Sequence, residues 1–341
     1  MQRRTSSAAN PPDFAGIVNT AIEHVKETGH DLGAIEAIRR AWRTRTGDEG
    51  AQHKGRARPQ RGNGAVIERV VGAAARAVLA ALVVVTPALV LPGTIGGGGF
   101  ALPIVCAVAA GFVFVEYYTD FPSVVDFRDA PPFNRLRFAC LFAIVLSTSV
   151  LCADQVRPTL FSGAVASLGA LTGGALDFPY SPVRMLLIGV ADGASLSALE
   201  IAQSAAGLAC VYAALTLGAF AIVLRRGWPL RDGPFNVWIN MPLFDPTSGG
   251  DIVHRLRRDG RVNLILGALL PFVLPAVIKA VTLAVGPLRL GDPHTLIWVM
   301  SVWGFLPVSM IMRALALQRV ADLVEDKRRR TAALREAPAP A

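Results

Sequence analysis

One carboxylate lies within an apolar, glycine-rich stretch of the chain. Asp192 follows Gly189-Val190-Ala191 and precedes Gly193. A charge at the centre of a bilayer costs at least ~2.5–3.5 kcal/mol on insertion scales, so such residues usually face a polar pathway or a partner. If this stretch spans the membrane, Asp192 is the leading candidate for ion or proton handling. If the stretch is re-entrant or interfacial, Asp192 is simply hydrated.

Two more charges belong to the same set of pathway candidates. Glu200 follows Asp192 in the same region, and Lys279 lies inside the long apolar stretch at 262–287. Lys279 is about two helical turns from the expected outer end of its stretch, which is close enough for its long side chain to reach the interface. The alternative is that Lys279 is a pathway cation and a partner for Asp192.

Asp245, Asp251 and His254 form a short cluster of carboxylates and an imidazole. Such groups can bind a metal ion or share a proton, but their spacing matches no zinc signature, and a solvated polar loop is the simpler interpretation. The chain contains no HExxH, GxSxG or Walker sequence, and no GxGxxG after a strand. We therefore predict no catalytic residue, no metal site and no cofactor. Enzyme activity is disfavoured but left open, because membrane-embedded enzymes can lack all these signatures.

A short polar sequence occurs twice. Residues 128–134 read Arg-Asp-Ala-Pro-Pro-Phe-Asn, and residues 231–236 read Arg-Asp-Gly-Pro-Phe-Asn. Both copies would follow a span of the same direction, as in the parallel repeats of transporters. The alternative is two interfacial turns, in which proline ends a helix and asparagine caps the next one. A duplication would predict symmetric ion pairs at the membrane surface. The shared polar positions are Arg128, Asp129, Asn134, Arg231, Asp232 and Asn236.

The elements that position these residues are set by long apolar blocks. Of the 341 residues, 52% are hydrophobic and only 17% are charged, against about 25% charged in typical soluble domains. A membrane-spanning helix needs about 20 mostly apolar residues. We therefore predict an all-α, polytopic transmembrane bundle. Six strong spans are expected, at residues 70–92, 100–118, 138–154, 204–224, 262–287 and 294–315.

The region between the third and fourth strong spans is ambiguous. Its two weaker segments, 158–176 and 185–201, are rich in glycine, alanine and serine. They are either two further spans, giving eight, or a re-entrant hairpin on the outer side. Small residues at a spacing of four permit close helix packing, and both segments carry such a stripe. The small residues concerned are Gly169, Gly173, Gly189, Gly193 and Ser197.

The distribution of basic residues predicts the orientation. The formal charge is +9, from 34 basic and 25 acidic residues. Cytoplasmic loops of membrane proteins carry an excess of Lys and Arg. A cytoplasmic N-terminus and C-terminus, with six or eight spans, places all but five basic residues in cytoplasmic segments. The five exceptions are Arg76, Arg157, Arg184, Lys279 and Arg289.

Three parts of the chain follow from this topology. Residues 1–64 are expected to form a small cytoplasmic amphipathic helical head with a flexible tether. Residues 65–316 form the transmembrane bundle, with cytoplasmic loops at 119–137 and 225–261. Residues 317–341 form a charged cytoplasmic tail. Trp228, in the second loop, is expected to anchor that loop at the lipid headgroups.

Two functional classes remain. The first is a transporter or permease-like protein for a small solute or ion, with a central pathway lined by the glycine-rich segments. The second is a non-catalytic scaffold or assembly factor that binds a protein partner or anionic lipid through its basic cytoplasmic surfaces. The high arginine and alanine content suggests a bacterial inner membrane. We expect anionic lipids as partners, together with a membrane-protein partner or a second copy of the chain. Nucleic acid is excluded because no aromatic–basic motif accompanies the charge.

Overall fold

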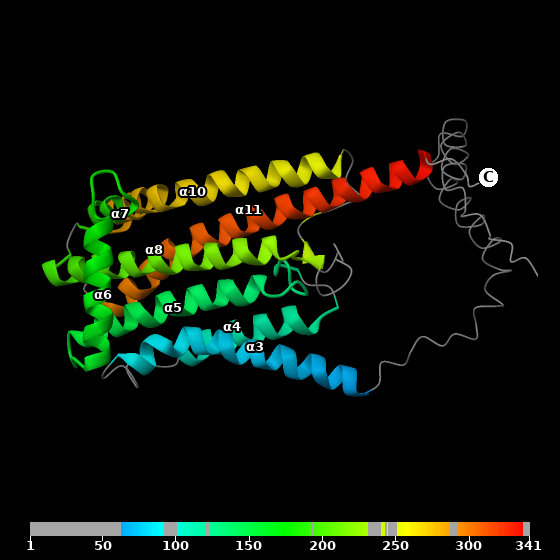
Figure 1. Ribbon diagram of the computed structural model, residues 1–341. Helices are drawn as coiled ribbons and strands as arrows, with labels where there is room; N and C mark the ends of the chain where they lie inside the picture. The colour runs from blue at the N-terminus through cyan, green and yellow to red at the C-terminus, as the bar shows by residue number, and fades with distance from the viewer. Residues whose placement is uncertain are drawn as a thin grey trace, which may run out of the picture. The chain divides into compact units, whose positions relative to one another are not determined.

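The computed structural model describes residues 63–91, 101–120, 123–191, 194–230, 240–242, 244, 251–286 and 292–336. The elements drawn in Figure 1 are α-helices, and no β-strand occurs within these residues. Six helices are long and apolar enough to cross a membrane, which confirms the predicted helical membrane bundle. They are α3 (Asn63–Val90), α4 (Ala101–Tyr118), α5 (Phe133–Asp154), α8 (Leu196–Arg225), α10 (Ile252–Val285) and α11 (Pro293–Glu336). The predicted head at 1–64 lies almost entirely outside the described residues.

The ambiguous central region adds no further helix of spanning length. Helix α6 (Leu160–Leu176) has 17 residues and α7 (Pro182–Val190) has nine. Figure 1 shows α6 lying across one end of the long helices rather than parallel to them. The segment 185–201 is not one helix, because α7 ends at Val190 and α8 begins at Leu196. Of the two expected counts, the structure supports six spans.

The centre of the bundle is formed by α5, α8 and α11, which pack on one another, with α10 against α11 and α7 against α10. The buried core is largely apolar where these helices meet. Its polar members Ser149 and Ser301 donate to carbonyls four residues earlier in their own helices, so their hydroxyl groups are satisfied locally. The largest fully buried side chains of the long helices include Ile144, Leu208, Met300 and Met312.

Glycines allow α6 to cross α8 at short range. A Cβ atom added to Gly207 would lie 2.2 Å from the Gly173 nitrogen, and one added to Gly173 would lie 2.4 Å from the Gln203 carbonyl oxygen. Gly169 faces Ser204 in the same way. The small-residue stripe at Gly169 and Gly173 serves this close contact with α8, whereas the short α7 packs mainly on α10.

Gly189, which belongs to the second small-residue stripe, makes a close contact with a different helix. A Cβ atom at Gly189 would lie 2.9 Å from the carbonyl oxygen of Pro275. Helix α7 therefore uses its glycine to approach α10 instead.

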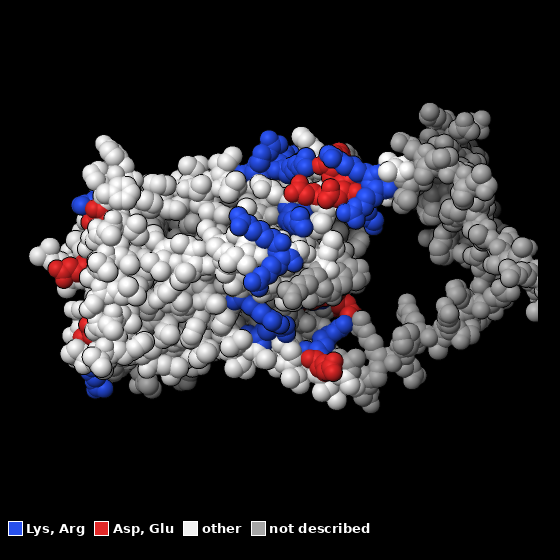
Figure 2. Space-filling model, viewed as in Figure 1, with Lys and Arg blue, Asp and Glu red and all other residues white. Residues whose placement is uncertain are grey.

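The charged side chains are unevenly distributed along the bundle. Helices α4 and α8 end, and α5 and α10 begin, at the same end of the bundle, to which α11 also returns (Figure 1). On the face in Figure 2, basic side chains form a band near this end, and the surface between the band and the opposite end is uncharged. We call the end of the bundle that carries this basic band the charged end. We call the uncharged part the apolar surface. The long helices expose many apolar side chains, including Ile104, Val108, Ile265, Leu269 and Val302.

Candidate functional site at the charged end

An aromatic cluster joins the two loops of the charged end. Trp228 follows α8, and its ring centroid lies 5.4 Å from those of Phe127 and Phe220. Phe133, at the start of α5, completes the cluster, and all four residues are buried. The Trp228 indole Nε1 donates to the Ala130 carbonyl oxygen at 3.1 Å. Trp228 was expected at the headgroups; it is a core residue instead, because its polar atom finds a partner inside the protein.

Two hydrogen bonds to Asn240 hold the same two loops together. The Phe127 N–H donates to the Asn240 carbonyl oxygen at 2.6 Å. The Asp129 N–H donates to the Asn240 side-chain oxygen at 3.0 Å. These bonds satisfy buried backbone groups that would otherwise be costly to remove from water. Residues 127–130 are thus held by Trp228 and Asn240, which lie on either side of the second copy of the repeated sequence.

The first copy of the repeated sequence closes the end of α4. The Arg128 guanidinium donates to the carbonyl oxygens of Glu116 at 2.8 Å and Thr119 at 2.7 Å. Basic side chains commonly satisfy the last carbonyls of a helix in this way. The expected pairing of Arg128 with Asp129 is present at 3.4 Å, but the Asp129 side chain is 56% exposed and the pair is a weak contact. Asn134 donates from α5 to the Asp126 carbonyl oxygen at 2.8 Å.

A charged network lies beside this loop, between the start of α5 and the middle of α11. The Arg313 Nε lies 2.9 Å from an Asp126 carboxylate oxygen. The Arg137 guanidinium donates to Ser309 Oγ at 2.7 Å and to the Asn134 side-chain oxygen at 3.2 Å. Burial raises the pKa of Asp126, and the guanidinium groups of Arg313 and Arg137 lower it, leaving the pKa above its ordinary value. The network ties the first loop to α11.

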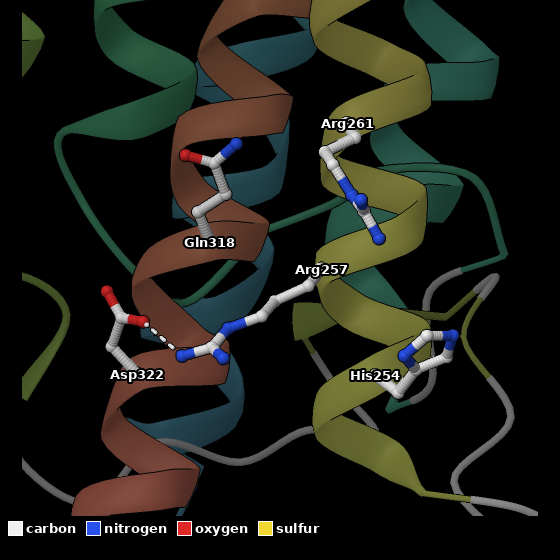
Figure 3. A pocket seen from close by; sticks show the side chains of 5 residues that line it. All are labelled: His254, Arg257, Arg261, Gln318 and Asp322. Atoms are coloured by element: carbon white, nitrogen blue, oxygen red, sulfur yellow. Dashed lines mark hydrogen bonds and ion pairs between the residues drawn. The ribbon is translucent and has the colours of Figure 1, made fainter.

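An open groove runs between α10 and α11 at the charged end, with a volume of about 530 Å³. Figure 3 shows its lining side chains, which come from one face of each helix: His254, Arg257, Arg261, Gln318 and Asp322. The Arg257 guanidinium pairs with Asp322 at 3.2 Å and with Glu325 at 2.6 Å. Sequence reasoning missed this groove. Its signal was the four-residue spacing of Arg257 and Arg261 on one helix and of Gln318 and Asp322 on the other.

The predicted cluster of Asp245, Asp251 and His254 is only partly visible. Asp251 caps α10 and accepts from Arg328 at 2.5 Å. That hydrogen bond lowers the pKa of Asp251. His254 lines the groove, and Asp245 lies outside the described residues. Within the part of the chain that the structure describes, no three His, Cys, Asp or Glu side chains gather in a way that could hold a metal ion.

The pathway candidates are placed as follows. Glu200 is exposed on the second turn of α8, at the end opposite the charged end. Lys279 is half-buried on α10, one turn after the Pro275 that contacts α7. Asp192 lies outside the described residues, as do Arg231, Asp232 and Asn236 of the second repeated sequence. The structure thus brings the helix carrying Lys279 against α7, the helix that ends two residues before Asp192.

No family model, no curated protein and no solved structure matches this chain.

Proposed function

We propose that this integral membrane protein is a non-catalytic scaffold that presents a basic surface to an acidic protein partner. The observation that carries the proposal is an excess of exposed, unpaired arginines at the charged end. Arg135, Arg225 and Arg226 are exposed and make no ion pair within the described residues. Complementary charge of this kind accelerates association and selects acidic partners.

The proposal includes the orientation. With the charged end in the cytoplasm of a bacterial inner membrane, the positive-inside rule is obeyed and both termini are cytoplasmic. One test uses a reporter that is active only on the periplasmic side of the membrane. Fused at Pro179, between α6 and α7, this reporter is expected to be active. The same reporter fused at Ala341 is expected to be inactive. Activity in the reverse pattern would invert the topology and contradict the proposal.

The packing of the glycines supports a scaffold over a pathway. The glycine-rich segments were one of the sequence's arguments for a central path, yet the space beside Gly173 and Gly207 is occupied by the α6–α8 contact. Gly304 of α11 likewise faces Ala209 and Ile144 at the centre of the bundle. Small residues in these positions serve close helix approach.

The test is capture from native membranes in mild detergent, followed by mass spectrometry. A protein partner is expected to co-purify with the wild-type chain and to be lost when Arg225 and Arg226 are both changed to Gln. The matched control is Arg157→Gln, an exposed arginine at the opposite end. If both variants retain the same set of proteins as the wild type, the basic end is not a partner surface.

Transport is the second candidate, supported by the contact of α7 with α10, which joins the neighbourhoods of Asp192 and Lys279. In this case Asp192→Asn should abolish solute or proton flux in reconstituted vesicles while leaving the membrane level unchanged. The control is Asp326→Asn, which removes an exposed carboxylate on α11 that is not a pathway candidate. A variant at Asp192 that conducts like the wild type in every flux assay would remove the main support for a pathway.

A further inference from the structure

The groove between α10 and α11 has two halves of different character. The half that lies farther from the apolar surface holds Arg257, whose charge is neutralised by Asp322 and Glu325. One helical turn nearer the apolar surface lie Arg261 on α10 and Gln318 on α11 (Figure 3). Neither of these two side chains has a hydrogen-bond or ion-pair partner within the described residues.

The floor of this half is a close helix contact. A Cβ atom at Gly260 would lie 3.2 Å from Gln318 Cγ and 3.3 Å from the Ala314 carbonyl oxygen. The missing side chain lets α11 approach α10, so the Arg261 and Gln318 side chains emerge from neighbouring backbones. A guanidinium fork and an amide NH₂ held on adjacent helices offer several donors to one group of acceptor oxygens.

The groove lies at the charged end, next to the first exposed apolar residues of α10. The turns of α10 that follow Arg261 expose an almost continuous apolar face, with Val262 at 49%, Ile265 at 58% and Leu269 at 51% exposure. A ligand seated at Arg261 therefore has water on one side and hydrocarbon on the other. An amphipathic molecule with an anionic head fits this border.

We propose that the groove binds the phosphate of an anionic phospholipid. Arg261 pairs with the phosphate and Gln318 donates to one of its oxygens, while an acyl chain lies along Val262, Ile265 and Leu269. Basic pockets between transmembrane helices on the cytoplasmic side are a known mode of anionic headgroup recognition. The lipid site is separate from the partner surface at Arg225 and Arg226, and it does not depend on the proposed scaffold function.

The experiment is native mass spectrometry of the purified full chain, titrated with phosphatidylglycerol or with phosphatidylcholine of the same acyl chains. The wild-type protein is expected to bind phosphatidylglycerol more tightly than phosphatidylcholine. Arg261→Gln should weaken phosphatidylglycerol binding about ten-fold, which corresponds to the loss of one charge-assisted hydrogen bond. Gln318→Leu should weaken it by a smaller factor, because a neutral donor is lost.

The matched control is Arg226→Gln, which removes an exposed, unpaired arginine from the same end of the bundle but outside the groove. It should leave phosphatidylglycerol binding unchanged. Equal losses in Arg226→Gln and Arg261→Gln would mean general attraction to a basic surface and would overturn the site. A separate arm uses inorganic phosphate without lipid. Stabilisation of the wild type, but not of Arg261→Gln, by millimolar phosphate alone would assign the groove to free phosphate and overturn the lipid proposal.

Discussion

The crossing of α6 and α8 gives a sharp test of the fold. We expect Gly207→Ala to destabilise the protein, because the new methyl carbon would meet the Gly173 nitrogen at 2.2 Å and its Cα at 2.6 Å. Both atoms are backbone, so no side-chain rotation relieves the overlap and the two helices must separate. Overpacking of this kind costs about 1–3 kcal/mol, and the rigid neighbour places the cost near the upper limit.

The same substitution also has a favourable component, which a matched control isolates. Replacing glycine by alanine inside a helix gains up to about 1 kcal/mol in helix propensity. Gly218 lies on the same helix with no other atom within 4 Å of its added Cβ. Gly218→Ala should therefore show only the stabilisation from helix propensity. Gly207→Ala should show the overpacking cost minus this stabilisation, a net decrease of about 2 kcal/mol in the free energy of unfolding.

The assay is thermal unfolding of the purified protein in one detergent, followed by tryptophan fluorescence. For a chain of this size, 1 kcal/mol corresponds to about 2 °C in Tm. Gly207→Ala should melt about 4 °C below the wild type, and Gly218→Ala at or slightly above it. A second pair, Gly173→Ala and Gly174→Ala on α6, should repeat the contrast, since Gly174 has open space around its Cβ. If Gly207→Ala and Gly218→Ala have the same Tm, the helices do not approach as described.

Two further predictions concern the charged end. Trp228→Phe leaves the Ala130 carbonyl oxygen without its buried donor. This loss costs about 1–3 kcal/mol, so Tm should fall by about 2–6 °C. Trp298→Phe is the control, at a position 37% exposed; it should change Tm little, and equal shifts in the two variants would contradict the buried role of Trp228. Asp126 has a pKa above its ordinary 3.8, so the native state binds this proton more tightly than the unfolded state does. Its contribution to stability is complete below pH 3.8 and is lost as the pH rises through the native pKa. Relative to Asp126→Asn, which cannot titrate, the wild-type Tm should fall over that window, and a rise would refute the burial of this carboxyl.

The apolar lengths of the spans were predictable, but the ends of the helices were not. Hydropathy located the third span at 138–154, whereas α5 begins at Phe133. The first turn is helical despite its polar residues, because Asn134 and Arg137 have partners in the neighbouring loop and in α11. Likewise α11 continues to Glu336, past the predicted 315. Its charged extension pairs with α10 through Arg257 and Glu325, a contact that hydropathy does not measure.

The candidate site shows the same division between local and long-range information. The Arg-Asp-small-Pro sequence marked residues 128–134 as notable, but nothing local indicated that Arg128 would cap α4 or that Trp228 would lie against Phe133. Asp126, Arg137 and Arg313 were missed as a network because they are distant in sequence and each is unremarkable alone. Their meeting depends on the packing of α5 against α11, which a periodicity argument does not supply.

The two loops that carry the repeated sequence end their preceding helices by different means. The end of α4 is closed by the Arg128 side chain, which takes carbonyl oxygens of its last turn. The end of α8 is closed by main-chain groups, with the Arg226 N–H on Ile222 and the Trp228 N–H on Val223. Gly227 makes this turn possible, because its φ of 93° is a conformation that a side chain disfavours. The end of α8 therefore needs no arginine to cap it in the way that Arg128 caps α4. If the two copies of the repeated sequence share a role, that role is not the closing of the preceding helix. The helix directions still permit a duplication, since α4 and α8 both run towards the charged end and α5 and α10 both leave it.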